Sequence, residues 1–329
     1  MKEETLRDIG EFECIHRIAH DLIYRPELVK LGTGDDGAVF MTPCGYDEVI
    51  STDTMVEGIH FTKRTMSAAD TGYHLCAVNF SDMAAMGAEP VSFVISAALP
   101  GDLSITWIES CYDGIRECCR EYSVNLLGGD ITGSKQGVIL TGTIVGIVPE
   151  NQAVKRSGAK EGDIVFVTGT LGDSSAGLSI LLDGKKEEYP MLAIQHQRPK
   201  PQIDFGRILR ESGASSLNDV SDGLSREINE IALASRVTIE LEKERIPLSD
   251  ELCRWGQDCG KEPFHFAING GEDYELVGTI SKKNWEYVKG IGGVTGIGHV
   301  TKAGKGQVFL KDKNSIKLLT IAGYDHFRS

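Results

Sequence analysis

The chain lacks the features that mark several common classes of protein. It contains no run of about 20 apolar residues of the kind that spans a bilayer. Its first residues, MKEETLRDIGEFE, are too charged for a signal peptide. Its eight cysteines, at positions 14, 44, 76, 111, 118, 119, 253 and 259, include no CxxC pair. We therefore expect buried free thiols in a cytoplasmic protein, with neither a disulfide framework nor a membrane span.

Basic residues are also scarce. The chain has 34 Lys and Arg against 48 Asp and Glu, which gives a formal net charge of −14. This balance argues against a nucleic acid or an anionic membrane as the main partner. A phosphorylated ligand is therefore expected to bind together with cations.

The signatures of two common ATP-binding folds are missing. The segment GTGDDGAV at 32–39 matches the glycine pattern of dinucleotide-binding proteins and protein kinases, but its two aspartates would repel a pyrophosphate unless a metal intervened. The absence of a VAIK lysine, an HRD loop and a DFG triplet excludes a protein-kinase fold. The segment GGDITGSK at 128–135 lacks the lysine that directly follows the second glycine of a P-loop.

The length of 329 residues corresponds to about two domains. The polar, turn-rich segment PENQAVKRSGAKEGD at 149–163 sets the expected boundary, giving domains 1–148 and 149–329. Periodicity predicts a mixed α+β domain in each half. The expected helices are an amphipathic one through 12–22 and others at 73–86, 107–118, 203–210, 224–234 and 249–255. The expected strands include 47–52, 91–99, 163–170, 237–241, 264–268 and 275–280.

Seven aspartates lie in short segments rich in Gly, Ser or Thr: Asp35, Asp36, Asp53, Asp82, Asp130, Asp219 and Asp222. Carboxylates beside small residues at the ends of strands or the starts of helices do not belong to the apolar core. Their hard oxygen ligands suit Mg²⁺ better than Zn²⁺. The pattern predicts a site for several magnesium ions. The alternative interpretations are purely structural: a helix charge that faces solvent for Asp82, and turn or helix-cap roles for Asp219 and Asp222. Asp70, just before a helix, is expected to be an N-cap.

Motifs along almost the whole chain resemble those of the thiamine-monophosphate kinases. These belong to a superfamily with aminoimidazole ribonucleotide synthetase, selenophosphate synthetase and a hydrogenase maturation protein. Acidic loops indicate the superfamily, whereas the His60 segment, GGEDYEL and GYDHF indicate this member. The matching segments are GDDGAV (34–39), STDTMVEGIHF (51–61), AVNFSDMAAMGAEP (77–90), GGD (128–130), RSGAKEGD (156–163), TGTLGDSSAGL (168–178), SDGL (221–224), GGEDYEL (270–276) and GYDHF (323–327).

Two relatives in the superfamily are disfavoured by their own signatures. A selenophosphate synthetase would carry a reactive Cys or selenocysteine with a nearby lysine before GDDGAV, and none is present. The maturation protein would end in a reactive cysteine, whereas this sequence ends in Phe327-Arg328-Ser329.

The resemblance implies a two-domain α+β fold of the aminoimidazole ribonucleotide synthetase type. A mixed α/β N-terminal domain would dimerise through its sheet, and a C-terminal α+β domain would complete the nucleotide and substrate site. The implied activity is ATP-dependent phosphorylation of thiamine monophosphate to thiamine diphosphate, with several Mg²⁺ ions and with ATP as co-substrate.

The resemblance also implies roles for individual residues. The implied magnesium ligands are Asp36, Ser51, Thr52, Asp53, Asp82, Asp130, Asp219 and Asp222. The nucleotide would contact Tyr112, Gly129, Asp130, Arg156 and Ser221, and the thiamine moiety would face His60, Glu272 and Tyr324. Asp35 and Asp273 lie beside these residues and are expected to orient them, while Thr132 is unassigned because Ile131 separates it from Asp130.

The implied reaction needs no general base. The acceptor is a phosphate monoester with a second pKa of about 6, so its oxygen is already deprotonated at pH 7. The obstacle is charge, because ATP at about −4, an acceptor at about −2 and up to about seven carboxylates require roughly three or more Mg²⁺ ions. Two other classes remain open. A metal-dependent phosphohydrolase would add histidines in GDxH or GNHE motifs, which are absent, and a non-catalytic nucleotide sensor would form no ADP.

Overall fold

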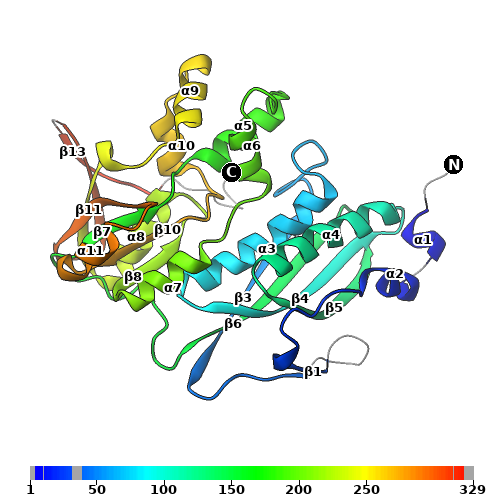
Figure 1. The fold of residues 1–329 in the computed structure, drawn as a ribbon. Helices are drawn as coiled ribbons and strands as arrows, with labels where there is room; N and C mark the ends of the chain where they lie inside the picture. Colours follow the sequence, from blue (N-terminus) through cyan, green and yellow to red (C-terminus); the bar gives the residue numbers. More distant parts are fainter. Residues whose placement is uncertain (1–3, 10, 32–38, 314, 322–329) are drawn as a thin grey trace. The chain divides into compact units, whose positions relative to one another are not determined.

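The computed structural model describes residues 4–9, 11–31, 39–313 and 315–321 (Figure 1). The chain divides into two compact units. The N-terminal unit contains the residues up to Met83 and Glu89–Asn151, and the C-terminal unit contains Ala84–Ala88 and the residues from Gln152 onward. The sequence analysis had placed the boundary between residues 148 and 149.

The N-terminal unit contains a four-stranded sheet with the order β3-β6-β4-β5. Strand β6 is antiparallel to both of its neighbours, and β4 and β5 run parallel with α4 as the crossover between them. The elements are α1 (Leu6–Ile9), α2 (Glu11–Ile18), η1 (Pro26–Leu28), β1 (Val29–Leu31), β2 (Val39–Phe40), β3 (Tyr46–Val56), α3 (Ala68–Ala85), β4 (Glu89–Pro100), α4 (Ile105–Glu121), β5 (Asn125–Ser134) and β6 (Ile139–Pro149).

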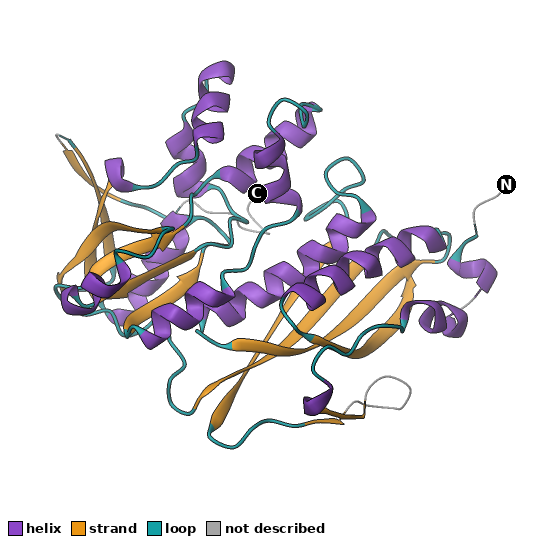
Figure 2. Cartoon of the chain, in the orientation of Figure 1, coloured by secondary structure: helices purple, strands orange, loops and turns teal. Residues whose placement is uncertain are grey.

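Helices α3 and α4 lie along one face of this sheet (Figure 2). Phe80 of α3 packs edge-on against Phe93 of β4, with ring centroids 5.4 Å apart. The two helices meet through glycines. A Cβ on Gly72 would lie 1.9 Å from the carbonyl oxygen of Cys111, and a Cβ on Gly114 would lie 1.9 Å from that of Ala69. The backbones therefore touch directly at this crossing.

The start of α3 corrects one expectation. Asp70 was expected to be the N-cap, but the helix begins at Ala68, so Ser67 occupies that position. The Ser67 hydroxyl accepts from the Asp70 amide at 3.1 Å, and the Asp70 carboxylate accepts from the Ser67 amide at 3.3 Å. Ser67 and Asp70 therefore form a capping box, with Ser67 as the N-cap and Asp70 as the third residue of the helix.

The C-terminal unit contains a seven-stranded sheet with the order β13-β12-β9-β11-β7-β10-β8. Among the described strands of this sheet, only the β12–β9 pair is parallel. The elements are β7 (Ile164–Thr168), α5 (Asp173–Asp183), α6 (Pro190–Gln197), α7 (Ile203–Glu211), β8 (Ala214–Asp219), α8 (Leu224–Ser235), β9 (Val237–Glu242), η2 (Lys243–Arg245), α9 (Asp250–Cys259), α10 (Pro263–Asn269), β10 (Leu276–Ile280), α11 (Lys282–Val288), β11 (Val294–Ala303), β12 (Gln307–Asp312) and β13 (Ser315–Leu318).

Both faces of the seven-stranded sheet are covered. Val165 and Val167 of β7 belong to a core shared with α8 and α10, whereas Phe166 faces a second core with α7 and α11. This alternation follows from the two-residue period of a strand. It explains why β7 is a continuous apolar run in the sequence.

One predicted strand is wrong. Residues 264–268 form helix α10, because Pro263 occupies a first-turn position where its fixed φ favours a helix. Ala267 and Ile268 are the residues of this helix that are buried. The alternation of Phe264, His265 and Phe266 resembled a strand pattern, and sequence analysis gave the proline too little weight.

The cysteines largely follow the expectation. All eight lie in the described part of the chain and are free, and five of them are buried: Cys14, Cys76, Cys111, Cys118 and Cys119. Burial raises the pKa of Cys111 to about 12, so this thiol stays protonated.

Glu275, which immediately precedes β10, is a buried acid in the C-terminal unit. Its carboxyl group accepts hydrogen bonds from the Thr168 hydroxyl and, at 3.1 Å, from the Gln202 amide. Burial raises its pKa to about 7, and the nearby charge of Asp173 also raises it. The group therefore holds its proton more tightly in the folded chain than in the unfolded chain.

This shift predicts a pH-dependent stability. A carboxyl group whose pKa is raised on folding contributes stability that is fully present below its ordinary pKa of 4.5 and is lost as the pH rises to about 7. Relative to Glu275→Gln, the natural protein should lose about 2–3 kcal/mol of unfolding free energy between about pH 5 and pH 8. Urea denaturation of both proteins at the two pH values measures this. A constant difference between them would contradict the buried, protonated form.

Candidate functional site

In the N-terminal unit, the fold brings together the motif of β3 and the motif of α3. Ser51 and Asp53 lie on the face of β3 that is covered by α3. The Ser51 hydroxyl donates to the Asp82 carboxylate at 2.5 Å, and the Asp53 amide donates to the Asn79 side chain at 3.1 Å. The first contact joins Ser51 to Asp82, and the two-residue period of the strand puts the Asp53 carboxylate on the same side of the sheet.

Thr52 points the other way, as the strand period requires. Its hydroxyl donates to the Gly142 carbonyl at 2.7 Å and lies 3.2 Å from that of Thr143. The side chain of Thr52 is therefore on the opposite face of the sheet from Ser51, Asp53 and Asp82.

Gly129 and Asp130 lie on β5, at the other edge of the sheet. A Cβ on Gly129 would lie 1.8 Å from the Ile95 carbonyl oxygen, so only glycine fits there. Asp130 pairs with the exposed Ser96 and so lies on the face that carries Thr52. Three strand spacings, about 14 Å, separate β5 from β3. Within one sheet, Asp130 is therefore remote from Ser51 and Asp53.

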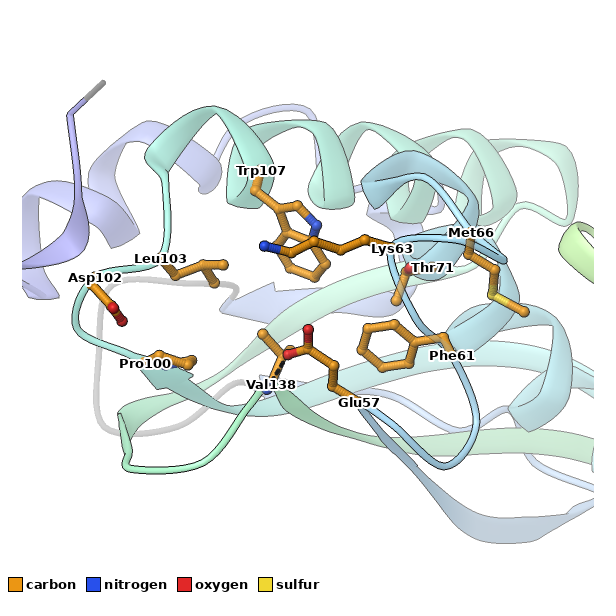
Figure 3. A pocket seen from close by; sticks show the side chains of 10 residues that line it. All are labelled: Glu57, Phe61, Lys63, Met66, Thr71, Pro100, Asp102, Leu103, Trp107 and Val138. Carbon is orange, nitrogen blue, oxygen red and sulfur yellow. Dashed lines mark hydrogen bonds between the residues drawn. The ribbon is translucent and has the colours of Figure 1, made fainter. Parts of the chain in front are cut away.

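His60 lies in a tight turn after β3. Its Nδ1 accepts from the Val56 amide at 2.9 Å, which leaves Nε2 as the nitrogen that carries the proton. The same turn opens a pocket of about 150 Å³ in the N-terminal unit. The side chains of Trp107 and Lys63 face those of Phe61 and Glu57 across it (Figure 3). None of the predicted site residues that the structure describes lines this pocket.

Four residues singled out in the sequence remain to be located: Tyr112, Asp35, Asp36 and Tyr324. Tyr112 lies half-buried on α4, where burial raises its pKa and the neighbouring Cys111 adds to the shift. Asp35, Asp36 and Tyr324 lie outside the described residues.

In the C-terminal unit, the pairing of β8 with β10 continues past both strands. The Val220 amide donates to the Glu275 carbonyl at 2.7 Å, and the Tyr274 amide donates to the Val220 carbonyl at 3.0 Å. The Glu272 amide then donates to the Ser221 carbonyl at 2.7 Å. These main-chain bonds hold the SDG segment and the GGED segment side by side.

The GGED segment has an unusual backbone. Glu272 and Tyr274 adopt φ values of 65° and 51°, in the left-handed region that residues other than glycine rarely occupy. A Cβ on Gly271 would lie 2.6 Å from the Ser221 carbonyl oxygen. The close approach of the two segments therefore depends on a glycine and on strained neighbours.

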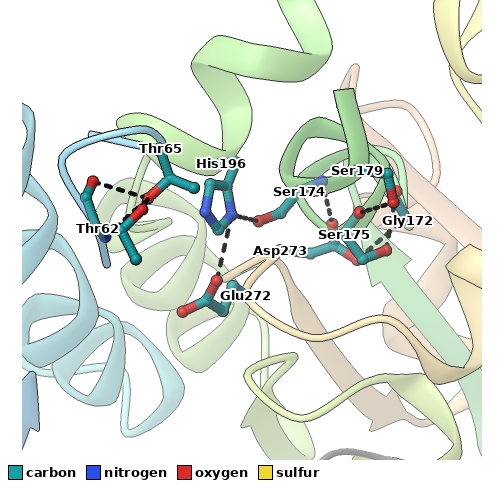
Figure 4. Close-up of polar contacts among 9 residues, drawn as sticks. All are labelled: Thr62, Thr65, Gly172, Ser174, Ser175, Ser179, His196, Glu272 and Asp273. Carbon is teal, nitrogen blue, oxygen red and sulfur yellow. Dashed lines mark hydrogen bonds and ion pairs between the residues drawn. The ribbon is translucent and has the colours of Figure 1, made fainter. Parts of the chain in front are cut away.

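Asp273 caps a helix. Its carboxylate accepts from the amides of Gly172 at 2.7 Å and Ser174 at 3.2 Å, at the start of α5 (Figure 4). Burial raises the pKa of Asp273 well above its ordinary value, although these two amides lower it. The residue expected to orient its neighbours thus anchors the GGED segment to α5.

His196 of α6 contacts Glu272. The Ser174 hydroxyl and the Glu272 carboxylate both lie 3.2 Å from the same atom, Nδ1 of His196 (Figure 4). A hydrolytic triad requires the nucleophile and the acid on different ring nitrogens. The arrangement therefore positions a glutamate and does not activate a serine.

Arg156 is connected to the SDG segment through buried side chains. Its Nε donates to the Asn218 side chain at 2.9 Å, and its guanidinium pairs with Glu230 at 2.9 Å. Asn218 in turn donates to Glu227, which also accepts from the Asp222 amide at 3.2 Å. Burial, followed by the charge of Asp219, raises the pKa of Glu227 to about 8.

Sequence reasoning missed Asn79, His196, Asn218 and Glu227. One signal was available for Glu227. It lies on the apolar stripe formed by Leu224, Ile228 and Ile231 of α8, and an acid on such a stripe is buried and needs hydrogen-bond partners. The other three could not be found, because their partners are distant in the chain.

Two features are absent from the described residues, a metal-binding cluster of His, Cys, Asp or Glu and a membrane-spanning helix. Across residues 4–9, 11–31, 39–313 and 315–321, no three or more His, Cys, Asp or Glu side chains gather closely enough to hold a metal ion. In the same ranges, no helix is both long and apolar enough to cross a membrane.

Comparison with known proteins agrees with the fold. Residues 34–148 match the family model of the AIR synthase related protein N-terminal domain, and residues 160–311 match that of the C-terminal domain. The solved structure of hydrogenase maturation protein HypE in complex with ATP has the same fold, with a TM-score of 0.74 at 19% identity over 93% of this chain and 91% of that chain.

Several relatives of higher identity are thiamine-monophosphate kinases. The thiamine-monophosphate kinases of Bacillus subtilis and Escherichia coli are 38% and 39% identical to this chain, each over 97% of it and over 100% and 98% of their own lengths. The crystal structure of the Stenotrophomonas maltophilia thiamine-monophosphate kinase has a TM-score of 0.82 at 32% identity, covering 93% of this chain and 98% of that one. A structure of AaThiL complexed with AMPPCP and TMP has a TM-score of 0.76 at 34% identity, covering 97% and 99%. The chain therefore belongs to the thiamine-monophosphate kinase family.

Proposed function

We propose that this protein transfers the γ-phosphoryl group of ATP to thiamine monophosphate, giving thiamine diphosphate. The observation that carries the proposal is the identity of 38–39% to thiamine-monophosphate kinases over 97% of the chain. A relative of the same fold was solved with AMPPCP and TMP bound. The free state of all eight cysteines is in keeping with a cytoplasmic enzyme.

The N-terminal group Ser51, Asp53 and Asp82 is suited to Mg²⁺ by its donor atoms, which are all oxygens. Mg²⁺ usually keeps several waters and is bound by one or two carboxylates together with substrate phosphates. A group of this size therefore fits the ion without a cage of three acids. When bound, Mg²⁺ would neutralise phosphate charge and the charge that develops during transfer.

The C-terminal unit supplies phosphate and metal contacts of its own in this proposal. Arg156 is more than half exposed, so its guanidinium can meet the phosphates of ATP while Asn218 and Glu230 fix its position. Ser221 supplies a hydroxyl, and Asp219 and Asp222 supply carboxylates for further Mg²⁺ ions. Asp36 would add another ligand, although it lies outside the described residues.

The remaining roles follow from the same proposal. Gly129 would contact the nucleotide through its main chain, and Tyr112 is the weaker nucleotide contact. His60 would present a protonated Nε2 to the thiamine moiety, Glu272 would offer a carboxylate to it, and Tyr324 would offer an aromatic face to its cationic ring. No side chain has to remove a proton, because the acceptor phosphate is already ionised and the transfer can proceed in line.

We also propose that the enzyme is a homodimer formed through the open face of the four-stranded sheet. Ile50 is 71% exposed there, and Val94 on β4 is also exposed on this face. Asp130 lies on the same face at the far edge strand. A second sheet packed over this face would cover these side chains and lie against Asp130.

The first prediction from this proposal concerns the metal group, that is, Ser51, Asp53 and Asp82. Asp82→Asn should lower kcat by more than the roughly 10–100-fold that loss of an outer-shell partner costs, because it removes a charge that offsets Mg²⁺. The unfolding free energy should stay the same or rise, since like charges are relieved. Steady-state kinetics and urea denaturation measure both. Asp204→Asn, an exposed site on α7, is the matched control and should keep the normal rate. Near-normal activity of Asp82→Asn would remove Asp82 from the metal group.

The second prediction concerns Mg²⁺ concentration. The rate should continue to rise with Mg²⁺ after all ATP is present as MgATP, because the carboxylates need ions of their own. In Asp82→Asn the same rise should need more Mg²⁺. Titration of Mg²⁺ at fixed ATP, with ADP release as the readout, tests this. A rate that is already maximal when Mg²⁺ equals ATP would argue against a site for several ions.

The third prediction concerns assembly. Ile50→Arg should convert the dimer to a monomer, because it places a charge within the proposed apolar contact. Met191→Arg changes another exposed apolar residue, on α6, and should leave the dimer intact. Sedimentation equilibrium distinguishes the two. A natural protein that is monomeric, or an Ile50→Arg variant that remains dimeric, would refute the proposed interface.

A further inference from the structure

We propose that Glu227, a buried residue with no assigned role, is a positioning residue that sets the geometry of the nucleotide-phosphate contacts Arg156 and Ser221. The inference rests on the proposed function for those two contacts. Glu227 lies on α8 and is only 2% exposed. Its carboxyl group lies beneath the SDG segment and has hydrogen-bond partners on both oxygens.

One oxygen holds the SDG segment. Oε1 of Glu227 accepts from the Asp222 amide at 3.2 Å and lies 3.5 Å from the Ser221 hydroxyl. The Ser221 carbonyl is already fixed by the Glu272 amide at 2.7 Å. Glu227 therefore holds the other side of this short segment, which carries the Ser221 hydroxyl and the Asp222 amide.

The other oxygen controls Arg156 through one intermediate. Oε2 of Glu227 accepts from Nδ2 of Asn218, which is also only 2% exposed. This contact fixes the orientation of the Asn218 amide, so that its Oδ1 faces Nε of Arg156 at 2.9 Å. If the amide turned over, its NH₂ group would face the Arg156 donor instead, and the hydrogen bond would be lost.

The substitution Glu227→Gln separates this role from simple burial. Both carboxyl oxygens of Glu227 accept from N–H groups, whereas a glutamine side chain has only one acceptor atom. The variant must therefore lose the contact with Asp222, or the contact with Asn218 and with it the orientation of Arg156. The size of the side chain is unchanged, so no cavity forms.

The decisive measurement is the affinity for a non-hydrolysable ATP analogue in excess Mg²⁺, by isothermal titration calorimetry. Glu227→Gln should raise the Kd about tenfold, the effect of losing one well-placed hydrogen bond to a charged group. Glu227→Asp keeps two acceptor oxygens and should recover most of the affinity. Glu275→Gln makes the same change at another buried acid of this unit, and its Kd should stay within about twofold of the natural protein.

A double-mutant cycle tests whether Glu227 acts through Arg156. In an Arg156→Ala background, Glu227→Gln should raise the Kd by only about threefold or less, because one of its two routes is already lost. Asn218→Ala cuts the same route without altering Glu227 and should likewise be non-additive with Arg156→Ala. If Glu227→Gln does not fold, full additivity in this second cycle overturns the route, because Glu227 can reach Arg156 only through Asn218 in this inference.

The outcomes separate this inference from the proposed function. If Arg156→Ala and Ser221→Ala each leave the Kd unchanged, the assignment of the phosphate contacts fails, and the inference fails with it. If those variants weaken binding but a folded Glu227→Gln stays within about twofold, only the role of Glu227 is overturned. Full additivity in both cycles would show that Glu227 does not act through Arg156.

Discussion

The main-chain pairing of β8 with β10 is the interaction on which the C-terminal site depends. It extends past Asp219 and Leu276, the ends of the two strands, through the amides of Val220, Tyr274 and Glu272. Without this extension, the SDG and GGED segments would be two unrelated loops separated by about fifty residues of sequence. With it, Ser221, the proposed phosphate contact, and Glu272, the proposed thiamine contact, share one backbone ladder. The caps and ion pairs around them refine positions that this ladder has already set.

The buried acids near this ladder follow a common principle. Glu227, Asp273 and Glu275 all have raised pKa values, and burial is the largest cause in each case. Each also accepts hydrogen bonds from main-chain or side-chain groups of a neighbouring segment. Buried acids are costly unless such partners are present. In this unit, hydrogen-bonded acids therefore join segments that the apolar core does not fix.

The sequence allowed much of the fold to be predicted where local signals and burial agree. The helix near 73–86 and the strands at 91–99 and 237–241 were predicted from apolar periodicity, and the structure has α3, β4 and β9 there. Local pattern failed at 264–268, where one proline outweighed an alternating motif. It also missed β8, whose sequence ASSLND carries little apolar signal although the last four residues of this edge strand are buried.

The candidate site was predictable in its parts but not in its assembly. The acidic motifs could be read from the sequence, yet the contact of Ser51 with Asp82 joins residues 31 positions apart, and nothing local specifies it. The strand period does separate Thr52 from Ser51 and Asp53. The location of Asp130 on the far edge strand depends on strand order, which no single segment encodes.

The glycine contact between α3 and α4 links tolerance to mutation with Ser51, Asp53 and Asp82, the proposed Mg²⁺ ligands. Helices that touch through their backbones have no side chains at the crossing that could repack around an added methyl group. Alanine at Gly72 or Gly114 would push the two axes apart, and α3 carries both Asn79 and Asp82. A sub-ångström displacement there would reach the carboxylate that contacts Ser51. The absence of side chains at Gly72 and Gly114 thus sets the spacing of α3 and α4. That spacing in turn fixes the position of Asp82, a proposed Mg²⁺ ligand more than two helical turns from Gly72.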